Sequence, residues 1–296
     1  MRVLVCLSSI PMLAVASACA DKPSMDTAPG GGDSGGSGGT AELDCASQEG
    51  VRFVSADGTI QDRTQEFAAG SAGAPASIAI DQDGVLEVCG GTWNVLLDVR
   101  SADLVLRGDA RVSQPVLSGG GSGPIIQVRT PGARFVAEDL EFTGAIACFG
   151  SVLTAADMAV PCDQEALPVQ ADVTFRRSRL VGNAFDFGGG VVGVTGGLVT
   201  LEDTLISDND GHGVFALGGD VRCTGSAEVE AGLRNNSKSG VWLSEPGQDS
   251  GRTLVSEGCD WGGNGQDDVR LDTETYFTGF GDDADFTCDA IALTCG

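Results

Sequence analysis

The segment Asn209-Asp-Gly-His-Gly-Val214 recurs 27 residues later as Asn236-Ser-Lys-Ser-Gly-Val241, with Asn, Gly and Val at matching places. The asparagine belongs to a longer series with spacings of 26, 27 and 28 residues: Asn183, Asn209, Asn236 and Asn264. An apolar residue stands three places before each asparagine: Leu180, Ile206, Leu233 and Trp261. A period of this length predicts a solenoid, because stacked repeats bring like residues into ladders.

The composition of each repeat favours short strands. Apolar and β-branched runs such as Val199-Thr-Leu201 alternate with Gly, Asn and Asp turns, and no amphipathic helix beyond two turns is evident after Cys45. Asparagine suits a coil corner, because it tolerates the left-handed conformation and its amide can hydrogen-bond to the next coil. We therefore predict an all-β, single-stranded parallel β-helix over residues 44–296.

One coil contains an insertion. The run Phe135–Gly144 matches Val199–Asp208, which aligns Ala145 with Asn183 at a spacing of 38 residues. The excess of about 12 residues over the usual repeat falls around Cys148 and Cys162. We expect an inserted loop near residues 145–169, clasped by a disulfide between these two cysteines. Loops on a solenoid face often carry binding.

The first forty residues resemble an export signal followed by a tether. An uncharged apolar run over residues 3–16 is too short to span a bilayer, so residues 1–18 are predicted to be a signal peptide. Val15-Ala-Ser-Ala-Cys19 resembles a bacterial lipoprotein signal, which implies a lipid anchor on Cys19. The same residues also fit ordinary signal-peptidase cleavage, which would release a secreted protein. The Gly/Ser-rich residues 19–43 are typical of a flexible tether.

The resemblance to lipoproteins also bears on location and on cysteine pairing. Asp directly after the lipidated cysteine tends to retain such proteins at the inner membrane, and here that place is Ala20. We therefore expect a lipid-anchored protein of the outer membrane, facing the cell surface, with no other contact to the membrane. Without Cys6 and a lipidated Cys19, eight cysteines remain, as a set of disulfides requires. Their connectivity is open, and the local candidates are Cys148 with Cys162 and Cys288 with Cys295.

The charge of the chain limits its partners. The 296 residues contain 42 Asp and Glu against 17 Lys and Arg, a formal net charge of −25. This excludes binding through a nucleic-acid backbone, which needs a basic face. We assign no cofactor and no metal site. Weak calcium binding is left open, because residues 262–269 fit one copy of a calcium nonapeptide and Asp282, Asp283 and Asp285 add charge.

Several further segments carry a family resemblance. They are Gly84–Trp93, Leu104–Gly108, Pro115–Gly120 and Cys259–Asn264. These runs resemble right-handed parallel β-helix repeat proteins of bacterial surfaces, within the pectin-lyase-like superfamily. The resemblance covers roughly residues 80–271 and implies a right-handed solenoid. It leaves activity open, because the superfamily includes lyases, hydrolases and adhesins.

Two motifs invite a catalytic interpretation. Arg129-Thr-Pro-Gly-Ala-Arg134 resembles the pattern around the catalytic arginine of pectate lyases, but no histidine precedes it, and we favour a turn between strands. Gly211-His-Gly213 resembles a motif of polygalacturonases, which invert with paired aspartates. Those aspartates should lie upstream, whereas Asp267-Asp268 follows, so we favour a turn histidine. We assign no catalytic residue, and one histidine in a turn also disfavours a Ser-His-Asp triad.

Aromatic side chains offer a third possibility. Trp93, Trp242 and Trp261 could form a sugar-stacking platform. Trp261 falls in the apolar series before the asparagines, which favours the core. Trp242 lies between Val241 and Leu243, which places it on the outward side of a strand.

We therefore predict a surface-displayed lipoprotein with a structural, adhesive or binding role and no catalysis. The expected partner is a polysaccharide or another surface protein. The alternative is a carbohydrate-active β-helix enzyme, either a polysaccharide lyase or a glycoside hydrolase.

Overall fold

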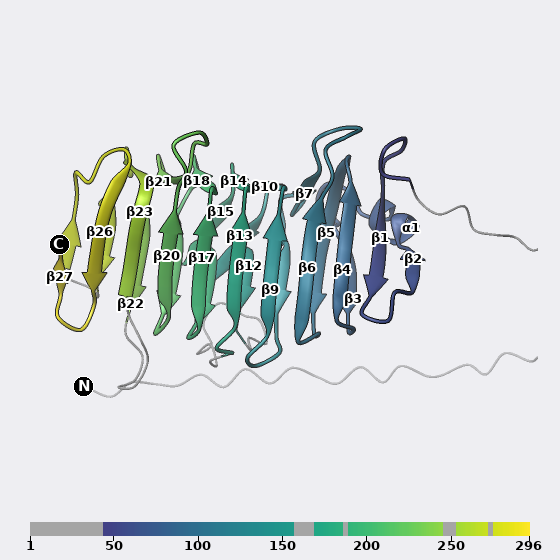
Figure 1. Cartoon of the computed structure of the whole chain (residues 1–296), viewed down its shortest axis with the longest axis horizontal. Helices are drawn as coiled ribbons and strands as arrows, with labels where there is room; N and C mark the ends of the chain where they lie inside the picture. Colours follow the sequence, from purple (N-terminus) through teal and green to yellow (C-terminus); the bar gives the residue numbers. More distant parts are fainter. Residues whose placement is uncertain (1–43, 157–168, 186–188, 245–252, 272–274) are drawn as a thin grey trace, which may run out of the picture. The chain divides into compact units, whose positions relative to one another are not determined.

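The computed structural model describes residues 44–156, 169–185, 189–244, 253–271 and 275–296. The predicted signal peptide, the tether and Cys19 lie outside the described residues. The described chain is an all-β parallel β-helix in which successive coils stack along one axis (Figure 1). In Figure 1 the near strands point upward while the coils advance from right to left, so the helix is right-handed, as predicted.

Each coil contributes one strand to each of three faces. The first face contains β1 (Gly50–Ser55), β4 (Gly84–Cys89), β6 (Asp103–Gly108), β9 (Arg134–Glu138), β13 (Asp172–Arg176), β17 (Leu198–Glu202), β20 (Asp220–Thr224), β23 (Thr253–Gly262) and β26 (Ala284–Asp289). Its outermost strands are β2 (Ile60–Asp62) and β27 (Thr294–Cys295). Pairing is parallel from β4 to β23 and antiparallel beyond them, so both ends of this face are closed by strands that reverse direction.

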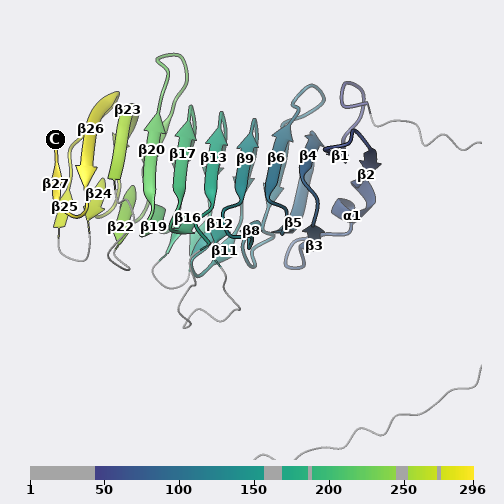
Figure 2. The ribbon, with the colours of Figure 1, turned by 60° about the horizontal axis from the view of Figure 1, so that its bottom comes forward.

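The second and third faces complete the coil. The second contains the start of β5 (Thr92–Val99), then β7 (Val116–Ser118), β10 (Glu141–Thr143), β14 (Arg179–Val181), β18 (Leu205–Ser207), β21 (Gly232–Arg234) and the end of β23. The third contains β3 (Ala76–Ile80), the end of β5, β8 (Ile126–Val128), β12 (Gly150–Ala155), β16 (Gly190–Thr195), β19 (His212–Leu217), β22 (Val241–Ser244), β24 (Val269–Leu271) and β25 (Thr275–Phe277). Strands of the third face run along the lower side of the molecule in Figure 2.

Residues at equivalent places in the coils form the core, as the sequence period predicts. Leu180, Ile206, Leu233 and Trp261 are successive register partners on the second face, each at most 2% exposed. Val214, Val241 and Val269 are partners on the third face. Period-2 alternation turns every second side chain of a strand inward, so these ladders fill the solenoid with apolar side chains.

The four asparagines form a continuous row, which we call the asparagine ladder, and its first three members are buried. The Nδ2 of Asn183 donates to Oδ1 of Asn209 at 3.1 Å, and Nδ2 of Asn209 donates to Oδ1 of Asn236 at 2.9 Å. Asn236 continues the row to Asn264 at 3.2 Å. The coil before Asn183 has Ala145 at this place, and its backbone N–H donates to Oδ1 of Asn183 at 3.1 Å. The 38-residue spacing inferred for that coil is therefore confirmed.

The insertion lies in the same coil. Within the predicted loop 145–169, β11 (Ile146–Ala147) and β12 are strands of the coil. β11 pairs with β15 (Ala184–Phe185) of the next coil in a small separate sheet. Residues 157–168 lie outside the described residues.

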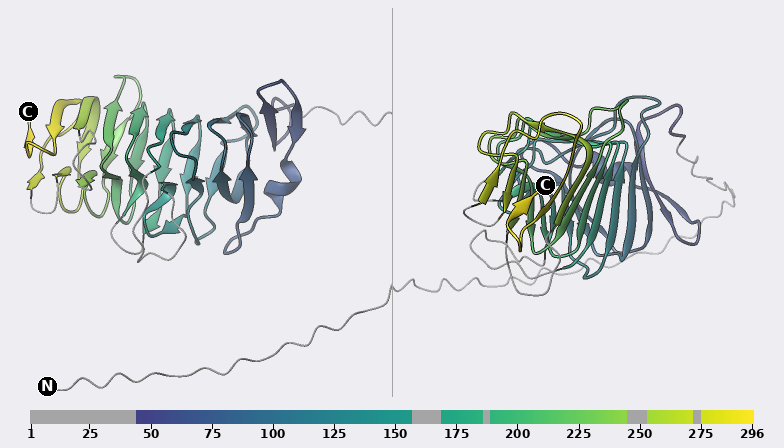
Figure 3. Two further views of the ribbon diagram at one scale, coloured as in Figure 1. Left: turned by 90° about the horizontal axis from the view of Figure 1, so that it is seen from below. Right: turned by 60° about the vertical axis from the view of Figure 1, so that its left-hand side comes forward.

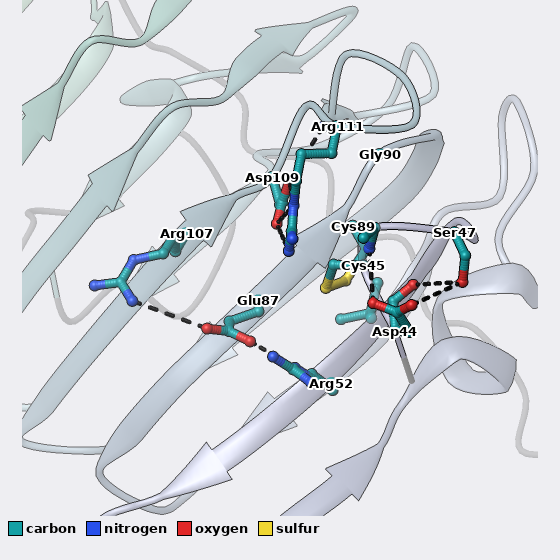
Figure 4. Close-up of a disulfide and its surroundings, with 12 residues drawn as sticks. Asp44, Cys45, Ser47, Arg52, Glu87, Cys89, Gly90, Arg107, Asp109 and Arg111 are labelled. Carbon is teal, nitrogen blue, oxygen red and sulfur yellow. Dashed lines mark hydrogen bonds and ion pairs between the residues drawn. A yellow bond between two sulfur atoms is a disulfide. The ribbon is translucent and has the colours of Figure 1, made fainter. Parts of the chain in front are cut away.

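A second row runs along the outer side of the first face, and we call it the charge ladder. Its members are successive register partners of alternating sign: Arg52, Glu87, Arg107, Glu138, Arg176 and Glu202. Ion pairs join them, at 2.5 Å between Arg107 and Glu138 and 2.5 Å between Arg176 and Glu202. Figure 4 shows the first three members beside a disulfide.

Disulfides concentrate toward the two ends of the described solenoid. Cys45 bonds to Cys89 at the end of β4, and Cys288 bonds to Cys295 as the sequence suggested. Cys223 bonds to Cys259 between neighbouring coils near the C-terminal end. Cys148 is also disulfide-bonded, and its predicted partner Cys162 lies outside the described residues.

The N-terminal end is covered by β1, β2 and the short helix α1 (Thr64–Ala68), which buries Phe67 against the core. Figure 3 presents the molecule from below and obliquely toward its C-terminal end, where β26 and β27 close the first face. Within the described residues, no helix has the length and apolar character needed to cross a membrane.

Candidate binding surface

The outer side of the third face changes character along the solenoid. Thr154, Gly193, Phe215 and Trp242 are successive register partners on β12, β16, β19 and β22. Arg270 on β24 and Tyr276 on β25 extend the row. The row therefore passes from small residues to large rings toward the C-terminal end. We call Phe149, Phe215, Trp242, Arg270 and Tyr276 the aromatic face.

Contacts within the aromatic face are continuous. The ring centroids of Phe215 and Trp242 lie 4.7 Å apart. The guanidinium carbon of Arg270 lies 4.5 Å from the centroid of Trp242 and 5.5 Å from that of Tyr276, so the cation is shared by two rings. Cation–π contacts of this kind hold a guanidinium over a ring face. Tyr276 is 54% exposed, and Trp242 is partly exposed. Trp242 thus lies on the outward side of its strand, as predicted.

A glycine makes room for the inner end of the aromatic face. Phe149 packs its ring against Phe215 at 5.4 Å between centroids. A Cβ on Gly193 would lie 2.7 Å from Cδ1 of Phe149 and still closer to its backbone oxygen. Only glycine therefore allows the segment around Phe149, which follows disulfide-bonded Cys148, to cross the outer side of β16.

The single histidine lies beneath this surface. His212 begins β19 and is 2% exposed, covered by Trp242 at 5.0 Å and Phe185 at 6.4 Å between centroids. It is therefore a buried strand residue, whereas the sequence suggested a turn. Burial, together with the charges of Lys238 and Arg270, lowers the pKa of His212 to about 3. The imidazole is neutral at neutral pH.

His212, Ser239 and Asp267 are brought together across three coils, but not in the order of a catalytic triad. The backbone N–H of Ser239 donates to Nδ1 of His212 at 3.1 Å, while the Ser239 hydroxyl donates to Oδ1 of Asp267 at 2.5 Å. A triad requires the histidine to accept the serine hydroxyl proton. Burial raises the pKa of Asp267 although its bond to Ser239 favours the carboxylate. His212, Ser239 and Asp267 therefore join three successive coils through buried hydrogen bonds.

The arginine motif is a turn between strands, as favoured from the sequence. β8 ends at Val128, and β9 begins at Arg134. Arg129 is ion-paired with Asp98 at 2.9 Å and donates to Gln127 at 2.8 Å. Arg134 lies 3.7 Å from Asp103. Both arginines therefore lie beside carboxylates as ion-pair partners within the turn.

The segment that resembled a calcium nonapeptide turns its carboxylates into the protein. Oδ1 of Asp268 accepts from Asn264 at 3.1 Å, and its Oδ2 accepts the backbone N–H of Gly279 at 2.7 Å. Asp285 accepts the backbone N–H of Gly258 at 2.8 Å. Among the described residues, no group of three or more His, Cys, Asp or Glu side chains is arranged to hold a metal ion.

The other tryptophans lie away from the aromatic face. Trp261 is 2% exposed and donates its Nε1–H to Ser256 at 2.9 Å, so its core position is confirmed. Trp93 is partly buried, packs edge-on against Phe67 and donates to the Gly90 carbonyl at 2.8 Å. The three tryptophans therefore do not form one platform, and only Trp242 of the three belongs to the aromatic face.

An acidic hollow of about 340 Å³ lies near the C-terminal end, lined in part by Glu228, Asp260 and Asp283. Arg234 enters it and pairs with Glu230 and, at 4.0 Å, with Asp260. A carboxylate-rich lining disfavours anionic ligands at this place.

Comparison with known proteins adds no relative: no family model, no curated protein and no solved structure matches the chain.

Proposed function

We propose that this protein is a lipid-anchored β-helix displayed at the bacterial surface, within the pectin-lyase-like superfamily, and that it binds a neutral polysaccharide without catalysis. The signal-like residues 1–18, Cys19 and the Gly/Ser-rich tether support the anchor. Release as a secreted protein is the alternative, because the same residues also fit ordinary cleavage.

The observation that carries the binding role is the aromatic face. Trp, Tyr and Arg are the residues most enriched where proteins bind partners, because they combine apolar area with hydrogen-bond donors. Phe149 and Phe215 are each only 9% exposed and support the surface from beneath, so the accessible row runs from Trp242 through Arg270 to Tyr276. Neighbouring strands lie about 4.8 Å apart, so this row spans roughly 10 Å, enough for a short oligosaccharide. The apolar C–H side of a sugar can stack on the rings, and Arg270 can donate to its hydroxyls.

The charge of the chain selects among polysaccharides. A net charge of −25 repels a polyanion, and within the described residues two cations, Lys238 and Arg270, lie over rings of this region. Charge repulsion therefore opposes the binding of a neutral glycan less than that of an acidic one. Its recognition then depends on stacking and hydrogen bonds, which salt affects weakly.

The absence of catalysis is proposed from how the candidate groups are used. His212 accepts a backbone N–H, Arg129 is paired with Asp98, and Asp267 receives a serine hydroxyl. Inverting hydrolysis needs two carboxyl groups on opposite sides of a sugar with room for water. Each of these three groups instead joins one part of the fold to another.

The binding role is tested with the full chain in detergent against a panel of neutral and acidic polysaccharides. We expect binding to a neutral glycan, weakened about tenfold or more by Trp242→Ala and by Tyr276→Ala, which is ~1.4 kcal/mol or more. Tyr276→Phe keeps the ring and is the matched control, with affinity within about threefold of wild type. Equal binding by wild type and Trp242→Ala would refute this surface.

Catalysis and anchoring are tested separately. Release of reducing ends or unsaturated sugars from the same panel, with and without calcium, would favour the enzyme alternative. Labelling with palmitate in cells should occur on the wild type and be lost in Cys19→Ala. Labelling that persists in Cys19→Ala would contradict the anchor and favour the secreted form.

A further inference from the structure

The described chain begins one residue before a disulfide. Cys45 is 2% exposed, and its partner Cys89, at the end of β4, is fully buried. Asp44 and Ser47 form a tight turn around Cys45, with the Ser47 hydroxyl donating to the Asp44 carboxylate at 3.1 Å (Figure 4). Tension that arrives along the backbone from the N-terminal side passes Cys45 before it reaches β1.

The register beyond Cys45 determines how such a force would act. β1 pairs with β4 in antiparallel register, beginning with Gly50 opposite Cys89 and ending with Ser55 opposite Gly84. A pull toward the N-terminus loads the Gly50 pair first and would open the later pairs one at a time. Backbone hydrogen bonds are individually weak, so opening in sequence needs less force than breaking them together. β1 also holds Val51 and Phe53 in the core.

The disulfide moves the load past this weak point. Cys89 ends a strand whose other edge pairs in parallel with β6, the next coil of the first face. The turn after it is fixed, because Trp93 donates to the Gly90 carbonyl at 2.8 Å. The Gly91 N–H donates to Ser113 at 2.8 Å, and the Ser113 hydroxyl donates to Glu49 at 2.5 Å. Force at Cys45 thus passes by a covalent bond into the coil ladder.

We propose that Cys45–Cys89 is a mechanical joint, which transmits tension from the N-terminal segment to the solenoid and keeps β1, β2 and α1 folded under tension. Its role on a cell rests on the proposed surface tether. The mechanical property belongs to the folded residues and needs neither membrane nor ligand. Absence of palmitate labelling would contradict the proposed lipid anchor, whereas a negative pulling experiment would contradict the proposed mechanical joint.

The test is single-molecule pulling of the full chain between handles at its two ends. In Cys45→Ala/Cys89→Ala we expect an early low-force step as residues 46–75 are released, a lengthening of roughly 100 Å at about 3.3–3.6 Å per residue. The oxidised wild type should lack this step. The wild type opened by a reductant after folding should show it, which covers the case in which the double variant does not fold.

The matched control removes the disulfide at the other end. Cys288→Ala/Cys295→Ala should release only the last strand, a step of roughly 25 Å at full extension, and should keep the N-terminal end closed. The joint is disproved if the oxidised wild type shows the 100 Å step at the same force as the double variant. It is equally disproved if neither the double variant nor the reduced wild type shows that step.

Discussion

The asparagine ladder and the charge ladder both align one side chain from each of several coils, yet they differ in their exposure to solvent. Asn183, Asn209 and Asn236 are 2%, 3% and 1% exposed, whereas the side chains of Arg176 and Glu202 are 37% and 39% exposed. Removing a buried hydrogen-bonding group leaves its partners unsatisfied without water. Exposed ion pairs are worth little, because water and salt screen them. The same stacking geometry should therefore stabilise the coils more in the buried asparagine ladder than in the exposed charge ladder.

The largest effect is expected for Asn209→Ala. Oδ1 of Asn209 accepts from the backbone and side chain of Asn183, and its Nδ2 donates to Leu180 and Asn236. Because several buried groups lose partners at about 1–3 kcal/mol each, the free energy of unfolding should fall by about 4 kcal/mol. Urea unfolding followed by circular dichroism measures it. Exposed Ser237→Ala, in the next coil, is the control, expected within about 0.5 kcal/mol of wild type. Similar losses in both variants would show that burial of the asparagine ladder does not determine its contribution to stability.

A smaller effect on the free energy of unfolding is expected on acidification, through the buried His212, which is hydrogen-bonded to Ser239. The native pKa of His212 is about 3, against 6.5 in the unfolded chain, so the unfolded chain binds more protons between these values. The contribution of neutral His212 to the free energy of unfolding is complete above pH 6.5 and is lost as pH falls toward 3. Between pH 7.5 and 5 the free energy of unfolding should drop by about 2 kcal/mol from this group.

His212→Gln is the comparison for the pH experiment. Its amide oxygen can still accept from the Ser239 backbone, but it does not titrate. Urea unfolding of both proteins at several pH values should give a shallower slope for the variant in this range. Asp267, whose pKa is raised by burial, acts in the opposite sense, because its protonation favours the native state as pH falls. Parallel slopes would show that His212 is not the group responsible.

The smallest effect is expected in the charge ladder. Glu138 contacts Arg107 at 2.5 Å, Arg176 at 3.5 Å and Arg177 at 3.7 Å, and it is the most buried carboxylate there. Glu138→Gln should cost about 1 kcal/mol at low salt and less in 1 M salt, because the three arginines remain partly exposed. The control Glu257→Gln removes a pair that is 52% exposed on both sides and should change almost nothing. A salt-independent loss of several kcal/mol would place Glu138 among the buried groups instead.

The core was predictable because one period controls it. Asn209 and Asn236 occupy the same place in successive coils, so the apolar residues at fixed offsets from them turn inward together. The charge ladder obeys the same register but escaped notice. Its partners are separated by 35, 31 and 26 residues at Arg52–Glu87, Arg107–Glu138 and Arg176–Glu202, since loops of different length lie between strands. In β6, β9, β13 and β17 a charged residue directly after the second inward residue of the strand was the available signal.

Other features depended on contacts that no period encodes. Cys223 is opposite Ser256 in the register, yet it bonds to Cys259 three residues further along β23, so the pair could not be found from the repeat. His212 was expected in a turn, but the rings of Phe185 and Trp242 cover it. The outward direction of Trp242 followed from strand alternation. Arg270 follows from the same period, because it lies between Val269 and Leu271, whereas Tyr276 became visible only when β25 folded back on β24.

The antiparallel strands at both ends of the first face have a consequence for how the protein can change in length. Every coil between β4 and β23 meets its neighbours in the same parallel register, while the reversed strands occur only outside them. Duplicating the 27 residues from Asn209 to the residue before Asn236, with Cys223→Ser in the first copy because Cys259 can pair with only one cysteine, would add one coil and leave both ends unaltered. Each duplication extends the rod by about 4.8 Å. The length of the solenoid can therefore be changed one coil at a time without redesigning its ends.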